Sequence, residues 1–137
     1  MDNRLDEFIR QNSQELTDSI TKQVLFEVPG WREIPLRKTL ERIEKFLFVL
    51  GDSIRQDNPN FLITYLNSIS VRRIKEGVTI SALHGLMDIA EARIIEQIHS
   101  AEENDQGKKV FINVIKNALA SAKVTLSIAY IKKDQEG

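Results

Sequence analysis

The sequence contains no cysteine, and only two of its 137 residues are histidines. Disulfide bonds and thiolate chemistry are therefore excluded, and the chain is compatible with a reducing compartment. The two histidines, His84 and His99, stand fifteen positions apart, which is about four turns of one helix and too far for one small metal site. Because there is no HExxH pair either, we expect no metal ion and no other cofactor.

Motifs that mark common enzyme classes are also missing. The chain has no P-loop and no GxGxxG turn for nucleotide phosphates, and it has no GxSxG elbow for a nucleophilic serine. A serine–histidine–acid set assembled from distant positions stays open, because such sets are recognised by geometry and not by sequence order. We predict a non-enzymatic protein, with a helical enzyme of unknown chemistry as the weaker alternative.

No single sign of charge dominates, since 19 Lys and Arg face 20 Asp and Glu for a net charge of -1. A general attraction to nucleic acid is therefore not expected. The first sixteen residues, MDNRLDEFIRQNSQEL, are too polar for a signal peptide. No uninterrupted apolar run approaches the roughly 20 residues that a membrane-spanning helix needs. We expect a soluble cytoplasmic protein without membrane contact.

Proline and glycine are scarce, with three and six residues, and several of them separate segments in which apolar residues recur every three or four positions. That spacing predicts amphipathic helices. The expected five principal helices cover residues 3–26, 35–54, 59–73, 79–98 and 108–133. We expect one all-α domain over residues 1–137, in which residues 132–137 are a polar tail or the start of a linker.

The segment 35–54 has the most regular pattern of the five. Pro35 suits the first helical position, and Phe46, Phe48 and Val49 widen the apolar face beyond a narrow seam. We expect these aromatic residues to be core, with a cofactor pocket as the alternative. The next helix has Asn58 as its expected cap and Pro59 at its first position, and Phe61 is expected on its inner face.

A tight corner is predicted between the third and fourth helices. Gly77 suits the position just past a helix end, where a left-handed backbone is cheap only without a Cβ atom. Thr79 can cap the following helix, and Val78 with Leu83 can form a hydrophobic staple across the first turn. The helix that starts here carries one continuous apolar stripe, so we expect it to be central.

The residues around this corner resemble a known family. Arg72, the run Gly77-Val78-Thr79, Leu83, Met87 and Glu91 are similar to the N-terminal domains of the RsbR group, the stressosome proteins also called RsbT co-antagonists, and to the related RsbRD-type sensor domains. The resemblance implies a globin-like fold without haem that dimerises and passes an input signal to a C-terminal STAS domain. It also implies other stressosome-type proteins as partners. The 137 residues contain no STAS domain, so we expect an input module of bacterial stress signalling.

The first and last helices are the expected dimer interface. The apolar stripe of the first is interrupted at Asn12-Ser13, which suggests that Leu16 and Ile20 contact a second subunit, with a frayed surface helix as the alternative. The last helix has a second apolar stripe formed by Val124, Ile128 and Ile131, which must be buried against something. Residues 123–131 also alternate as a strand would, but no other segment offers a pairing strand.

Three residues or pairs have a second interpretation that involves a ligand. His84 is a candidate haem ligand, which is the main alternative to a protein that only senses and dimerises. Arg72 and Arg73 near a helix end are explained by the helix dipole, and a carboxylate or phosphate clamp is the alternative. Trp31 in a loop is expected to cover the core, with a ligand platform as the alternative.

Overall fold

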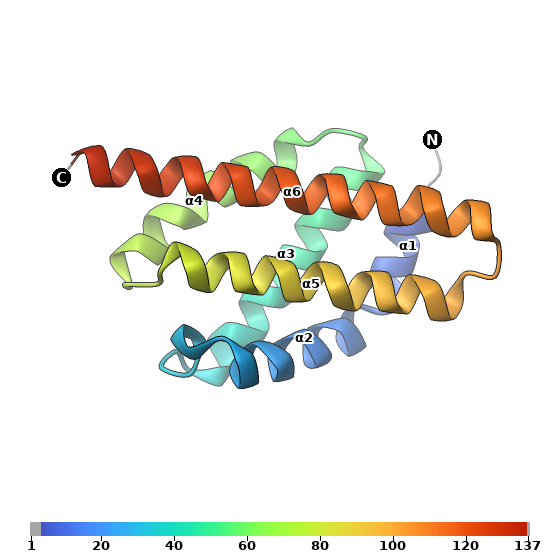
Figure 1. Ribbon diagram of the computed structural model, residues 1–137, viewed down its shortest axis with the longest axis horizontal. Helices are drawn as coiled ribbons and strands as arrows, with labels where there is room; N and C mark the ends of the chain where they lie inside the picture. Colours follow the sequence, from blue (N-terminus) through green and yellow to red (C-terminus); the bar gives the residue numbers. More distant parts are fainter. Residues whose placement is uncertain (1–3, 137) are drawn as a thin grey trace.

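Figure 1 shows the computed structural model, which describes residues 4–136. In chain order the elements are α1 (Arg4–Gln11), α2 (Ser13–Glu27), the 3-10 turn η1 (Pro29–Trp31), α3 (Leu36–Arg55), α4 (Asn60–Lys75), α5 (Ile80–Ala101) and α6 (Asp105–Glu136). No strand occurs in the part of the chain that the structure describes, so the all-α prediction is confirmed.

Helix α5 is central, as its sequence predicts. It packs against α6 on one side and α2 on the other (Figure 1), while α3 contacts α1, α2 and α4. The predicted stripe of α5 is almost completely buried, and each of its large apolar side chains contributes about 2 kcal/mol to folding by leaving water. Its fully buried members are Leu83, Met87, Ala90, Ile94 and Ile98.

The corner between α4 and α5 forms as predicted. Gly77 has a φ of 81°, in the left-handed region that favours glycine. The backbone amide of Ala82 donates to Thr79 Oγ1 at 3.1 Å, so Thr79 caps α5. Val78 and Leu83 both belong to the core, as the two ends of a staple should.

The first predicted helix is broken in two, so residues 4–136 contain six α-helices where five were expected. At the break, the backbone amide and the side-chain Nδ2 of Asn12 both donate to the carbonyl of Phe8. An asparagine side chain that competes for backbone groups in this way favours the end of a helix. The chain bends there, and both α1 and α2 then pack against α3 (Figure 1).

The two proline-marked helix starts agree with the prediction to within one residue. Asn58 Oδ1 accepts the amide of Asn60 at 3.0 Å, and Pro59 has a helical backbone, so Asn58 acts as the cap. Pro35 instead has an extended backbone, with ψ 133°, and precedes the first helical residue Leu36. The short η1 segment places Trp31 in the core at 2 % exposure, where its Nε1 donates to the carbonyl of Ala82 at 3.0 Å.

Helix α6 is continuous over the ambiguous segment 123–131, so the strand alternative is wrong. The predicted tail from residue 132 continues the same helix to Glu136, and Gly137 lies outside the described residues.

Two aromatic residues expected in the core are exposed instead. Phe48 on α3 is 56 % exposed and Phe61 on α4 is 44 % exposed, because the inner face of each helix is occupied by other residues.

Candidate functional site

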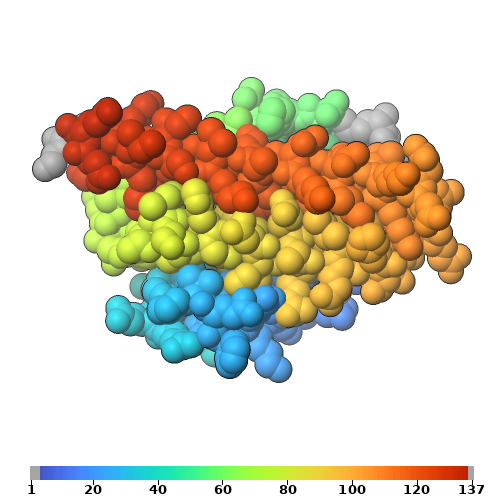
Figure 2. All heavy atoms as spheres, viewed as in Figure 1, coloured from blue at the N-terminus to red at the C-terminus, as the bar shows by residue number. Residues whose placement is uncertain are grey.

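Helix α6 runs the whole length of the molecule along one edge (Figures 1 and 2). Its inner face packs against α4 and α5, and Ile115, Leu119, Ala122 and Leu126 there are 0 % exposed. Its opposite face is exposed and also apolar. We call this face the outer stripe; its residues are Val110, Asn117, Val124, Ile128 and Ile131.

The outer stripe carries no charge over its length. Val110, Val124 and Ile131 are 48, 58 and 56 % exposed, and together with Asn117 they repeat every seven residues, so they share one side of the helix. The nearby Lys123 is turned toward α5, where its Nζ lies 2.8 Å from Asp88 Oδ1. Four exposed, branched apolar side chains in line mark a surface that favours contact with another apolar surface.

The composition of α6 has a second consequence. Among residues 4–136, this helix is the one that is long and apolar enough to cross a membrane by length and composition. Its inner face is nevertheless packed inside the protein, and the core helix of a globular protein can have the same length and apolar composition. The two apolar faces together account for the composition, and the outer stripe is the face that remains about half-exposed in the described chain.

A groove of about 300 Å³ runs beside the outer stripe, between α4 and the last turns of α6. Its floor includes Val71 and Ile128, which are 55 and 48 % exposed. Lys75 of α4 and Lys132 and Lys133 of α6 line its edge. The apolar surface around Ile128 is therefore wider than α6 alone.

The prediction of an interface at the first helix is wrong for its two named residues. Leu16 and Ile20 lie on α2 and are both 0 % exposed, because the bend at Asn12 turns this face of α2 into the core of its own chain. The three candidates on the last helix do face outward. Val124, Ile128 and Ile131 are 58, 48 and 56 % exposed.

Side chains from α3 and α4 meet beneath the α4–α5 corner. Glu76, the residue that closes α4, accepts from Arg42 Nη2 at 2.6 Å and from Arg73 Nη1 at 3.1 Å. One carboxylate thus serves two guanidinium groups. Arg73 is only 6 % exposed, and Arg42 Nη1 is buried without an acceptor among the described residues. The cluster therefore has one more positive than negative charge.

The pKa values of this cluster follow from that arrangement. Burial lowers the pKa of Arg73, the charge of Arg42 lowers it further, and Glu76 opposes both. Burial alone would raise the pKa of Glu76, but the hydrogen bonds and charges of Arg42 and Arg73 outweigh it and leave that pKa below its ordinary value. Both groups are charged at neutral pH. The two groups therefore form an ion pair at the end of α4.

Helix α6 is hydrogen-bonded to the same α4–α5 corner. The hydroxyl of Tyr130 donates to the carbonyl of Val78 at 2.6 Å, and burial raises the pKa of Tyr130. Of the three motif residues, Gly77 and Thr79 shape the corner as predicted, whereas Arg72 is exposed and its neighbour Arg73 makes the buried contact. The sequence did not reveal that Glu76 and Tyr130 take part in the contacts at this corner, because their hydrogen-bond partners lie 34 and 52 positions away along the chain.

His84 is a residue of α5, and its half-buried side chain points toward α6. Its Nε2 is 3.2 Å from the carbonyl oxygen of Lys123 and 3.0 Å from Ser127 Oγ. An axial haem ligand must direct the lone pair of its coordinating nitrogen at the iron, within an apolar cavity. Ligation through Nε2 of His84 would therefore require both of these contacts to break. The contact to Ser127 resembles part of a nucleophilic set, but the backbone amides around Ser127 are engaged within α6 and offer no oxyanion hole.

No group of three or more His, Asp or Glu side chains within residues 4–136 is close enough to hold a metal ion. Comparison with known proteins does not add a family assignment, since no family model, curated protein or solved structure matches the chain. The globin-like fold and the RsbR-type resemblance therefore stay predictions.

Proposed function

We propose that this chain is a non-enzymatic sensory and dimerisation module that relays an input through α6 to an output domain. The observation that carries the proposal is the outer stripe of α6. In this proposal the module belongs to a cytoplasmic, stressosome-type bacterial stress-signalling protein, and other proteins of that assembly are its partners. The resemblance at Arg72, Gly77 and Thr79 supports this setting.

The stripe suits a second copy of the same helix. It extends over about 32 Å from Val110 to Ile131 at about 1.5 Å per residue, and its seven-residue repeat is that of a left-handed helix pair. Between the large side chains stand Ala120 and Ser121, which let a neighbouring helix approach closely. Asn117 is polar within the repeat, and a single asparagine at such a position fixes the register of paired helices.

A relay through α6 has a physical basis in the contacts of its last turns. Tyr130 connects these turns to the corner at Val78, while Glu76 of the same corner is held by Arg42 of α3. A change in how α3 and α4 pack would therefore shift the corner and, with it, the end of α6. In a dimer this shift alters the spacing of the two helices that lead toward an output domain.

The proposal is tested with Ile128→Glu, measured by sedimentation equilibrium over a wide range of protein concentration. We expect the unmodified protein to be a dimer, and the substitution to raise its dissociation constant about 100-fold or more, since each copy would bury an unpaired charge. Far-ultraviolet circular dichroism should stay the same. Leu36→Glu is the matched control, because Leu36 is 54 % exposed at the start of α3 and lies outside the stripe.

Two results would contradict the proposal. An unmodified protein that stays monomeric at every concentration removes the dimer. A loss of helicity in Ile128→Glu shows that Ile128 belongs to the core of its own chain, so that the outer stripe is not an interface.

A further inference from the structure

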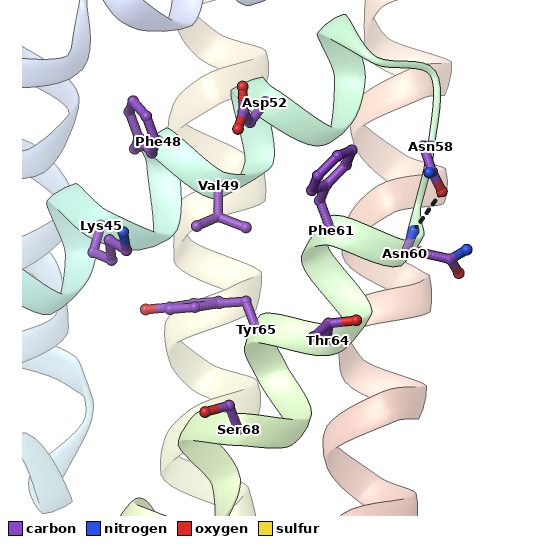
Figure 3. Close-up of a pocket in the computed structure, with 10 residues that line it drawn as sticks. All are labelled: Lys45, Phe48, Val49, Asp52, Asn58, Asn60, Phe61, Thr64, Tyr65 and Ser68. Carbon is purple, nitrogen blue, oxygen red and sulfur yellow. Dashed lines mark hydrogen bonds between the residues drawn. The ribbon is translucent and has the colours of Figure 1, made fainter.

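The groove between α3 and α4 is walled by aromatic rings on the outside of the protein (Figure 3). Phe48 from α3 and Phe61 from α4 lie on opposite sides of Val49, and Tyr65 lies below them. The two phenylalanines are 56 and 44 % exposed. The groove has a volume of about 610 Å³, which is within the range of small-molecule sites.

Two rings from different helices across an apolar floor make a surface that suits a flat guest. Exposed phenylalanines that gather in one hollow leave apolar area in water, and a planar ring between them would remove that area and add offset or edge-to-face contacts. The polar residues Thr64 and Ser68 lie at the rim of the groove and leave its centre apolar. The groove thus favours an aromatic ligand over an aliphatic chain.

Polar donors gather at one end of the groove. Lys45 Nζ lies 5.4 Å from the centre of the Phe48 ring, and the hydroxyl of Tyr65 points to the same side (Figure 3). No hydrogen bond to the Tyr65 hydroxyl occurs among the described residues. The carboxylate of the groove, Asp52, lies toward the other end and is paired with Arg55.

The charge behind this end is positive. Arg42 and Arg73 share the single carboxylate of Glu76, so that cluster has one uncompensated positive charge. The same guanidinium groups act on the groove: burial raises the pKa of Tyr65 above its ordinary value, and the charges of Arg73, Arg42 and Arg72 offset part of that rise. An ammonium group, a hydroxyl donor and excess guanidinium charge at one end together favour an anionic group there.

We infer that the α3–α4 groove binds a small aromatic carboxylic acid, with its ring between Phe48 and Phe61 and its carboxylate at Lys45 and the Tyr65 hydroxyl. The inference goes beyond the proposed sensory module and does not depend on a dimer. The groove is formed by α3 and α4, whereas the outer stripe belongs to α6.

The test uses 2-naphthoate as the probe and follows backbone amide shifts of the full chain by nuclear magnetic resonance. From the usual binding energy per atom we expect a dissociation constant of about 1 mM or lower, with the largest shifts at Thr64 and Ser68. The neutral 2-naphthamide and the cationic 2-naphthylmethylammonium should each bind about five-fold more weakly or worse.

Variants assign the contacts. Lys45→Gln and Tyr65→Phe should each weaken 2-naphthoate binding about five-fold, and Phe61→Ser about ten-fold, without loss of folding, because Lys45 and Phe61 are exposed and the Tyr65 ring is kept. Phe26→Ser is the matched control, since Phe26 is an exposed phenylalanine on α2 at 79 %. Ile128→Glu should also leave binding unchanged, which separates this inference from the dimer.

Three outcomes would overturn the inference. The first is the absence of binding at about 10 mM, ten times the expected constant. The second is equal or tighter binding of the neutral or cationic probe, which would show that the positive end does not select an anion. The third is unchanged binding in Phe61→Ser, which would place the probe elsewhere.

Discussion

At the scale of single residues, Glu76 is the side chain on which the α4–α5 corner depends most, because it forms two ion pairs there. It holds the buried Arg73 and the half-buried Arg42, so its loss leaves two guanidinium groups without their acceptor. We expect Glu76→Gln to lower the free energy of unfolding by about 2 kcal/mol at pH 7, less than for a fully buried pair because its side chain is 35 % exposed. Urea unfolding of both proteins measures the difference.

The effect of Glu76→Gln should depend on pH. The folded pKa of Glu76 is lowered, so its contribution is present above the ordinary value of 4.5 and disappears as the pH falls through the folded pKa. The two proteins should therefore become equally stable in acid. Glu41→Gln is the control, because the Arg37–Glu41 pair is exposed on both sides and is worth less than about 0.5 kcal/mol. A difference that persists unchanged at low pH would contradict the role of the charge.

At the scale of helices, the relay depends on the hydrogen bond between α6 and the α4–α5 corner. Tyr130→Phe removes the hydroxyl that donates to Val78 and keeps the ring in place. We expect a loss of about 1 kcal/mol, and faster amide hydrogen exchange over residues 127–136 than in the unmodified protein. Residues 111–122 should exchange as before, since their packing on α4 and α5 is unchanged.

Thr125→Val is a matched control for Tyr130→Phe. Its hydroxyl donates to the carbonyl of Ser121 within α6 and connects no second element. Its loss should not change exchange at the end of the helix. If both variants exchange alike over residues 127–136, Tyr130 does not fix the end of α6 and the relay loses its basis.

At the scale of the whole molecule, a dimer that unfolds as it dissociates has a melting temperature that depends on concentration. For two chains of 137 residues we expect a rise of about 3 °C for each tenfold increase in protein concentration. The dependence should vanish in Ile128→Glu and persist in Leu36→Glu. Differential scanning calorimetry at several concentrations measures it, and a constant melting temperature for the unmodified protein would argue for a monomer.

The boundaries on both sides of α4 and the start of α5 could be predicted, because their causes lie within a few residues of each boundary, whereas the break between α1 and α2 was missed. Gly77 permits the left-handed turn, Thr79 caps α5, and Asn58 with Pro59 starts α4, each through a contact no more than three residues away. The same holds for the continuous helix α6 and for its outward-facing Val124, Ile128 and Ile131. The two apolar faces of α6 can be read from its periodic pattern, but whether a neighbour in the same chain covers the second face cannot.

Tertiary structure alone decided which apolar faces are buried and which polar groups meet. The bend at Asn12 brought Leu16 and Ile20 inside, and the packing of α3 and α4 left Phe48 and Phe61 outside to form a groove. Periodicity gives the direction of a side chain around its own helix but not the neighbour that it meets. The pairing of Glu76 with Arg42 and of Tyr130 with Val78 depends on such neighbours, because burial and long-range hydrogen bonds exist only once the helices are packed.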